Sequence, residues 1–226
     1  MAAARRRANL RALIALAAAA CAAGIFLELA DDVIEGETRE LDEAVLLSFR
    51  EETDRDDPIG PRWVEEMARD VTALGGTVVL TFTTLAVTVF FLLQRKWHLG
   101  VYVAVAVMSG MIASSLLKSG FDRPRPDLVA HGQHVYTASF PSGHSMISAV
   151  AFLTLGALVA GAQKDRVMRL YILGLAAVLT LAVGVSRVYL GVHWPTDVLG
   201  GWSAGAGWAL LCWAISRQLR DRGRIE

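Results

Sequence analysis

The sequence is poor in cysteine, in charge and in any excess of one charge sign. Its two cysteines, Cys21 and Cys212, both lie in apolar runs, which predicts neither a disulfide framework nor a zinc site. Lysine plus arginine and aspartate plus glutamate number 22 each, so bulk charge predicts no nucleic-acid partner. Charged residues make up only 19% of the chain. No internal repeat or low-complexity linker divides it, which predicts a single domain over residues 1–226.

The chain is instead rich in long apolar segments. Hydrophobic residues make up 54% of it, above the roughly 45–50% that is typical of proteins in general. Six segments approach the about 20 residues that a helix needs to cross a bilayer, and they lie at about residues 10–29, 71–94, 98–118, 142–162, 168–187 and 196–216. We therefore predict an all-α fold, a polytopic bundle of six transmembrane helices. The first segment also fits a cleaved signal peptide, because a basic start precedes a short apolar core, but a retained helix is the favoured interpretation.

A polar, acid-rich stretch separates the first two apolar segments. Residues 28–70 contain sixteen carboxylates against five arginines, which we interpret as a solvated loop rather than a metal site. Within this stretch Leu41, Val45 and Phe49 recur at helical spacing. That spacing predicts a short amphipathic helix that lies against the extracytoplasmic membrane surface.

The basic residues between and beyond the apolar segments gather on one side of the predicted bundle. Thirteen of them do so: Arg5, Arg6, Arg7, Arg11, Arg95, Lys96, Lys164, Arg166, Arg169, Arg217, Arg220, Arg222 and Arg224. By the positive-inside rule this side is cytoplasmic. We therefore predict a multi-pass protein of the cell (inner) membrane with both termini inside. The acid-rich stretch, and three polar stretches at helix boundaries, then face the outside.

The first polar stretch places two cations around a turn. Lys118 and Arg125 are seven residues apart, and Gly120 and Pro124 between them disfavour a continuous helix. Basic side chains at helix ends often reach toward lipid headgroups, but positive charge is disfavoured on the non-cytoplasmic side. Converging lysine and arginine donors suit a phosphate group, because arginine supplies a planar fork and lysine a point charge.

The second polar stretch opens an apolar helix. Ser142 is a favourable N-cap, Gly143 lets the backbone approach a ligand, and His144 falls in the first turn. Free N–H groups and the helix dipole make such a helix start a binding site for anions. Taken alone, a capped helix with a histidine in its first turn is more often structural than catalytic.

The third polar stretch holds a histidine and a carboxylate four residues apart. His193 and Asp197 flank Pro195, which suits the first turn of the helix that begins there. At this spacing the carboxylate can reach the imidazole, fix its tautomer and raise the basicity of its other nitrogen. Arg187 adds an anion-binding group six residues before the histidine. The structural alternative is an interfacial salt-bridge cluster beneath Trp194.

In this order, at helix boundaries on one side, the three stretches read K-x6-RP, PSGH and SR-x5-H-x3-D. This combination resembles the signature of the type 2 phosphatidic acid phosphatase (PAP2) superfamily, which these residues match without a departure. The resemblance covers Lys118 to Asp197 and the six-helix plan, whereas the first seventy residues are the least diagnostic. It implies hydrolysis of a phosphate ester through a phosphohistidine, without a metal ion or other cofactor.

The resemblance also implies a role for each residue of the three motifs. His193 is the nucleophile, Asp197 orients it, and His144 protonates the leaving oxygen and then activates water. The phosphoryl oxygens are bound by Lys118, Arg125, Ser142, Gly143 and Arg187.

A site at the outer membrane interface predicts an amphiphilic substrate, a phosphorylated lipid taken from the bilayer. The resemblance makes undecaprenyl pyrophosphate, phosphatidylglycerophosphate and phosphatidate the candidates. We rank the polyprenyl carrier first because its recycling suits an outward-facing site. A lipid phosphotransferase on the same scaffold remains an alternative. A non-enzymatic lipid-binding or transport protein is a second alternative, which the filled catalytic positions disfavour.

Other conspicuous residues receive weaker interpretations. His131 and His134 are expected to be loop histidines near the site mouth rather than a metal pair, since no neighbouring ligands complete such a site. Asp122 and Arg123 either pair with each other or tune the rim of the site, and both interpretations stay open. Small residues in the last apolar segment predict close packing against its neighbours; they are Gly200, Gly201, Gly205 and Gly207.

Overall fold

A computed structural model describes residues 2–129 and 137–221 of the chain. His131 and His134, and the basic residues Arg222 and Arg224, lie outside the described residues. The described ranges contain eight α-helices and no β-strand, which confirms the all-α prediction. The helices are α1 (Ala2–Glu35), α2 (Arg39–Leu47), α3 (Arg62–Ala73), α4 (Thr77–Leu93), α5 (Trp97–Lys118), α6 (Gly143–Ala162), α7 (Arg166–Tyr189) and α8 (Pro195–Asp221).

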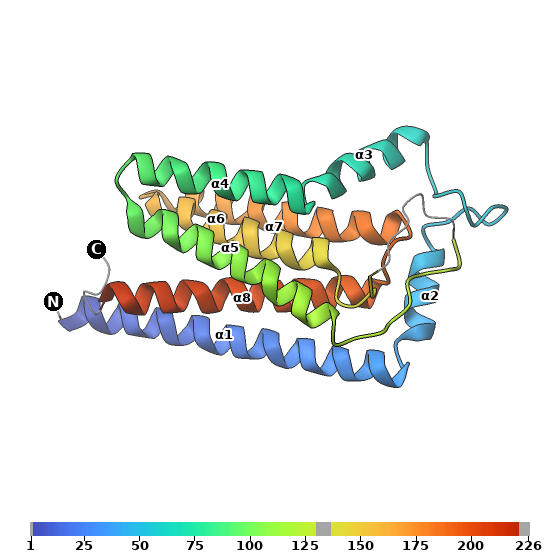
Figure 1. The fold of residues 1–226 in the computed structure, drawn as a ribbon, viewed down its shortest axis with the longest axis horizontal. Helices are drawn as coiled ribbons and strands as arrows, with labels where there is room; N and C mark the ends of the chain where they lie inside the picture. Colours follow the sequence, from blue (N-terminus) through green and yellow to red (C-terminus); the bar gives the residue numbers. More distant parts are fainter. Residues whose placement is uncertain (1, 130–136, 222–226) are drawn as a thin grey trace.

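Six long helices run side by side and form an elongated bundle (Figure 1). Helix α6 lies at its centre and packs against α7, α8, α5 and α4. Helix α1 packs along α8, and α4 packs along α5. The short helix α2 lies across one end of the bundle, and α3 continues α4 beyond that same end (Figure 1).

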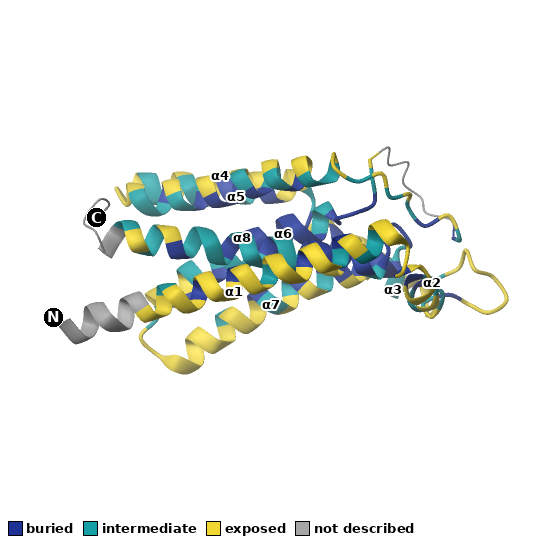
Figure 2. Cartoon of the chain, turned by 90° about the horizontal axis from the view of Figure 1, so that it is seen from below, coloured by how far each residue is buried: buried dark blue, intermediate teal, exposed yellow. Residues whose placement is uncertain are grey.

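The outer faces of these helices are exposed (Figure 2) and carry large hydrophobic side chains. Many large hydrophobic side chains of the described residues are exposed, for example Val78 at 82% and Leu93 at 80%. Such a surface is unfavourable in water and natural in a lipid bilayer. Five of the described helices are long and apolar enough to cross a membrane, and the bent pair of α3 and α4 makes a sixth span if it counts as one. The chain is therefore a multi-pass membrane protein.

The predicted span at residues 71–94 is divided in the structure. Helix α3 ends at Ala73, α4 begins at Thr77, and the two helices meet at an angle of 48°. Gly75 lies at the break, where a Cβ atom would come within 2.4 Å of a Val183 methyl carbon and 3.3 Å of the His144 carbonyl oxygen. The bend thus brings α3 close to the start of α6. The hydrophobic pattern predicts the apolar helix α4 at this place but does not show the bend.

The glycines of α8 allow its close approach to α6. A Cβ atom on Gly205 would lie 2.5 Å from the Met146 carbonyl oxygen, and one on Gly201 would lie 2.7 Å from the Ser142 carbonyl oxygen. Real Cβ atoms do not come this near, so only glycine permits the crossing. The packing role predicted for these residues is confirmed, and it fixes the start of α6 beside the start of α8.

The amphipathic helix predicted around Leu41 is present as α2, but its inward face differs from the predicted stripe. Leu41 is 61% exposed, whereas Asp42 and Leu46 are fully buried. Phe49 packs against the buried cluster around Leu46, so one end of the predicted stripe faces the protein. Asp42 also shows that the acid-rich stretch is not uniformly solvated.

Candidate active site

All three polar stretches meet at the end of the bundle that α2 covers. Lys118 is the last residue of α5, and Ser142 is the N-cap of α6. Arg187 lies in the last turn of α7, His193 in the turn that follows, and Asp197 in the first turn of α8. The helix boundaries therefore bring together residues that are up to 79 positions apart in the chain, from Lys118 to Asp197. The basic connections at Arg95 and Lys164 lie at the opposite end (Figure 1).

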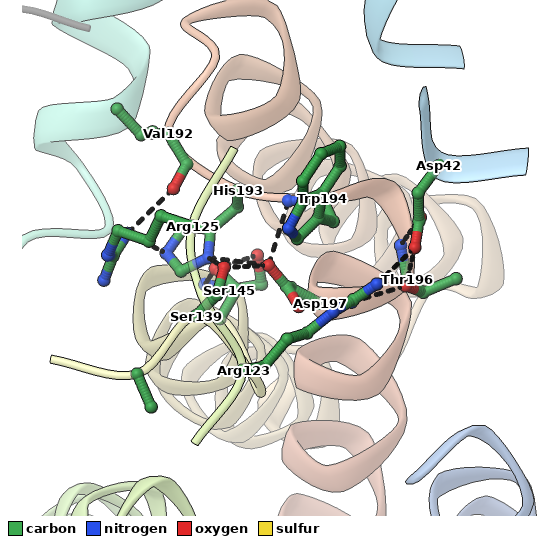
Figure 3. Close-up of polar contacts among 12 residues, drawn as sticks. Asp42, Arg123, Arg125, Ser139, Ser145, Val192, His193, Trp194, Thr196 and Asp197 are labelled. Atoms are coloured by element: carbon green, nitrogen blue, oxygen red, sulfur yellow. Dashed lines mark hydrogen bonds and ion pairs between the residues drawn. The ribbon is translucent and has the colours of Figure 1, made fainter. Parts of the chain in front are cut away.

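The carboxylate of Asp197 is the centre of the polar network in Figure 3. Its Oδ2 atom accepts hydrogen bonds from the Ser139 hydroxyl and from the Trp194 backbone N–H at 2.9 Å, and lies 3.2 Å from His193 Nδ1. Its Oδ1 atom accepts a bond of 2.7 Å from Arg123 Nη1. Asp197 is fully buried, so these four contacts replace water around the carboxylate and fix its orientation.

The surroundings of His193 determine its tautomer. Nδ1 faces the Asp197 carboxylate, which can only accept, so Nδ1 carries the proton. Nε2 then presents a lone pair, and Arg125 Nη1 lies 3.2 Å from it. Burial lowers the pKa of His193 to about 3, with the cations Arg187 and Arg125 acting in the same direction and Asp197 opposing them. The imidazole is therefore neutral near pH 7, with its unprotonated nitrogen directed toward a cation.

Backbone carbonyl groups hold the two cations of the first motif. Lys118 Nζ donates to the Ala138 carbonyl oxygen at 3.0 Å. Arg125 Nη1 donates to the Val192 carbonyl oxygen at 2.8 Å, and burial lowers the pKa of this guanidinium from its usual value. Arginine remains charged despite such a shift. A Cβ atom on Gly143 would lie 3.2 Å from Lys118 Cε, so the glycine makes room for the lysine beside the start of α6.

The N-terminus of α6 contributes backbone donors to the same place. The Ser142 hydroxyl caps the helix by accepting from the Ser145 N–H at 3.5 Å. The Ser142 N–H in turn donates to the Asp197 carbonyl oxygen at 2.9 Å, which joins the second motif to the third. The N–H groups of Gly143 and His144 belong to the first turn and have no acceptor within the helix, so they are available to an anion.

His144 and Arg187 line one polar cavity of about 340 Å³, which Thr72 and Val192 also line. Arg187 is 3% exposed, and its Nη1 atom donates to the Thr72 hydroxyl at 3.2 Å. Thr72 comes from α3, so the bend between α3 and α4 is what positions this contact. The cavity contains an imidazole and a buried cation, which suit an anion, and the carboxylates of Asp56 and Glu65 also line it.

All eight residues predicted for the site lie in this cluster or line its cavity. Three further residues belong to it and were not predicted, namely Asp42, Ser139 and Thr196, and so does Arg123, whose role the sequence left open. Of the two interpretations left open for Arg123, pairing with Asp122 is wrong, because Arg123 forms its ion pairs with Asp42 and Asp197. The sequence carries no signal for a contact with Asp42, since the two residues are 81 positions apart.

The sequence pattern of the PAP2 superfamily matches residues 99–221, which is 123 of the 226 residues. The chain belongs to the PAP2 superfamily. Phosphatidylglycerophosphatase B of Bacillus subtilis is 35% identical over 147 residues, which cover 63% of this chain and 70% of the relative. A putative undecaprenyl-diphosphatase of Escherichia coli is 32% identical over 56% of this chain and 63% of its own length.

A solved structure gives the same result. The crystal structure of a transmembrane PAP2-type phosphatidylglycerolphosphate phosphatase from Bacillus subtilis superposes with a TM-score of 0.77. It is 27% identical and covers 89% of this chain and 96% of its own. The family predicted from the three motifs is thus confirmed, and with it the prediction that the chain is a membrane lipid phosphate phosphatase.

Proposed function

We propose that this PAP2 phosphatase hydrolyses the phosphate or diphosphate head of a membrane lipid through a phosphohistidine formed on His193. The observation that carries the proposal is the neutral His193, with Nδ1 directed at Asp197 and Nε2 free of a proton beside Arg125. This arrangement supplies a nucleophile, a group that fixes its tautomer and a cation for the group under attack. No other described histidine has a carboxylate partner.

In the first step the Nε2 lone pair of His193 forms a bond to phosphorus, and the bond from phosphorus to the leaving oxygen breaks. His144 donates a proton to that oxygen, so the lipid leaves as an alcohol or as a monophosphate. In the second step water attacks phosphorus, the N–P bond breaks, and His144 takes the proton from the water. Inorganic phosphate is released and both histidines return to their starting states.

Three cations support the charge of the transferring group. Lys118, Arg125 and Arg187 surround the phosphoryl position, and the N–H groups at the start of α6 add further donors. Phosphoryl transfer depends mainly on positioning and on neutralising charge at the equatorial oxygens. These groups can supply both without a divalent ion, so we propose a metal-independent reaction with no cofactor.

The surroundings of the site support an amphiphilic substrate. An apolar groove of about 640 Å³ runs between α1, α5 and α8, and Leu117, next to Lys118, lines it. A lipid chain placed in this groove would leave its phosphate head near the cations. The likeness to a phosphatidylglycerophosphatase B at 35% identity supports phosphatidylglycerophosphate as the first substrate to assay. Undecaprenyl diphosphate, which ranks first from the sequence alone, follows it.

We also propose that the bundle crosses the cell membrane six times, with both termini in the cytoplasm and the site outside. Three observations support this arrangement: the bent α3–α4 pair is long and apolar enough to form one span, the basic connections gather at one end, and the site lies at the other. Cysteine-accessibility labelling in intact cells tests it. A cysteine introduced by Arg55→Cys, in the loop between α2 and α3, should be labelled by an impermeant reagent in intact cells. One introduced by Lys164→Cys should be labelled only after lysis.

A phosphate-release panel in detergent tests the function. Phosphatidylglycerophosphate, undecaprenyl diphosphate and phosphatidate are each incubated with wild type, with His193→Ala and with His98→Ala, a control at the opposite end of the bundle. Wild type and the control are expected to release phosphate, and His193→Ala is not. If the free phosphate falls short of the lipid phosphate consumed, the enzyme is a phosphotransferase. Turnover by His193→Ala would contradict the proposed nucleophile.

A further inference from the structure

An extensive polar network is centred on Arg123, which lies between Lys118 and Arg125 but is not one of the residues that the first motif specifies. Its Nη1 atom donates to Asp197 Oδ1 at 2.7 Å and to Thr196 Oγ1 at 2.8 Å. Its Nη2 atom donates to Asp42 Oδ2 at 2.5 Å and to Thr38 Oγ1 at 3.1 Å. One planar guanidinium therefore joins the extracytoplasmic helix α2 to the first turn of α8 (Figure 3).

Asp42 completes the connection from the other side. Its Oδ1 atom accepts the Thr196 backbone N–H at 2.9 Å, and its Oδ2 atom accepts the Thr196 hydroxyl at 2.6 Å. Asp42 is fully buried and Thr196 is 2% exposed. Asp42 thus binds Thr196, the residue immediately before Asp197, through both its backbone and its side chain. The same carboxylate also accepts the hydrogen bond from Arg123.

The charges in this network alternate. Asp42, Arg123 and Asp197 form a buried row of carboxylate, guanidinium and carboxylate, and the side chain of Arg123 is 13% exposed. Removing Arg123 leaves two buried carboxylates without this counter-charge, which is strongly unfavourable. An ion pair between Asp42 and Arg123 would be enough to attach α2 to the bundle. Arg123 also pairs with Asp197, the carboxylate that contacts His193.

We propose that Arg123 and Asp42 are positioning residues of the phosphatase reaction, which hold the Asp197 carboxylate in the orientation that presents His193 to phosphorus. The inference rests on the proposed function in one respect, namely that His193 is the nucleophile. Arg123 acts on Asp197 directly, and Asp42 acts through Arg123 and Thr196. Neither residue touches the substrate, so each should affect kcat more than KM.

The test compares Arg123→Gln, Arg123→Lys, Asp42→Asn and the double variant Arg123→Gln/Asp42→Asn with wild type. The matched control is Arg39→Gln, which removes an exposed ion pair with Glu43 from the same helix α2. We expect Arg123→Gln and Asp42→Asn each to lower kcat by about 10- to 150-fold, the range for a lost hydrogen bond to a charged group. KM should change by less than about threefold. Arg123→Lys should keep part of the activity, because it retains the charge but not the fork.

Two further readouts separate positioning from loss of structure. Because the residues act as one unit, the double variant should be no slower than the slower single variant, whereas independent structural effects would multiply. The acid limb of kcat/KM, measured with an activated aryl phosphate that needs no proton from His144, reports His193. The titratable and charged groups around that residue are Asp197, Arg123, Arg125, Lys118, Arg187, His144 and, one step further, Asp42.

The two substitutions should move this acid limb in opposite directions. Arg123→Gln removes a positive charge and raises the pKa of His193, so the limb moves to higher pH, whereas Asp42→Asn moves it to lower pH. Unchanged kcat in both folded variants overturns the proposal, and so do shifts in the same direction or multiplying losses. Turnover by His193→Ala would instead overturn the proposed function. The rates of the Arg123 and Asp42 variants relative to Arg39→Gln are measured separately, so the two failures can be told apart.

Discussion

Replacing Asp197 by asparagine removes one oxygen from a carboxylate to which four neighbouring groups are directed. Oδ2 serves the Ser139 hydroxyl, the Trp194 N–H and His193 Nδ1, while Oδ1 serves Arg123. An asparagine amide can place its NH₂ group at either position. At the position of Oδ2 the NH₂ group would face the donors Ser139, Trp194 and His193. At the position of Oδ1 it would face the guanidinium of Arg123. The substitution therefore breaks the network in either orientation without changing the volume of the side chain.

The size of the effect follows from these contacts. A lost hydrogen bond to a charged group is worth about 1.5–3 kcal/mol, or about 10- to 150-fold in rate. An NH₂ group beside Nδ1 would also favour the tautomer that carries its proton on Nε2, which removes the nucleophilic lone pair. The corresponding change in a Ser-His-Asp triad lowers kcat by about 10⁴-fold. We therefore expect Asp197→Asn to slow phosphoenzyme formation by about 10³- to 10⁴-fold.

Single-turnover quench with ³²P-labelled lipid measures this step directly, because it separates phosphoenzyme formation from product release. Thermal unfolding of the same preparation controls for stability, and substrate binding should be nearly unchanged. A folded Asp197→Asn enzyme that forms phosphoenzyme within tenfold of the wild-type rate would refute the role assigned to this carboxylate.

Three further predictions follow from the same geometry. His144→Asn should slow turnover of a lipid phosphate by about 10²- to 10⁴-fold, the range for general acid catalysis, but a p-nitrophenyl ester much less, because that leaving group departs without a proton. Burial holds the pKa of His193 below its ordinary 6.5, so with such an ester kcat/KM should stay level as the pH falls through 6.5, and a decline centred at 6.5 or above contradicts the neutral buried imidazole. Activity should be unchanged after dialysis against a chelator, and a loss that a divalent ion restores contradicts the metal-independent mechanism.

The motifs of the site could be predicted from the sequence because each occupies a helix boundary within a few residues. His193 and Asp197 are four apart, so one turn at the start of α8 is enough to bring them together. Ser142 caps α6 through a hydrogen bond to a residue three positions further on, and such a local contact can be predicted from the sequence. The apolar segments likewise predict where helices cross the membrane.

The support for the site could not be predicted in this way. Asp42 lies in an acid-rich stretch among many similar carboxylates, and only the fold places it beside Arg123 and Thr196. The stripe of Leu41, Val45 and Phe49 predicts the helix α2 but gives no sign that Asp42 is the residue that α2 buries. An ion pair across 81 residues depends on the packing of the whole bundle, which hydrophobic periodicity does not encode.

The identity of the phosphorylated residue tests the account most directly. Rapid acid-free quench of the ³²P-labelled enzyme, followed by peptide mapping, should locate an acid-labile, alkali-stable label on His193. The label should be absent from His193→Ala and present in the control His98→Ala. A label on His144 or on a serine, or a label that persists in His193→Ala, would contradict the central claim that His193 attacks the lipid phosphate.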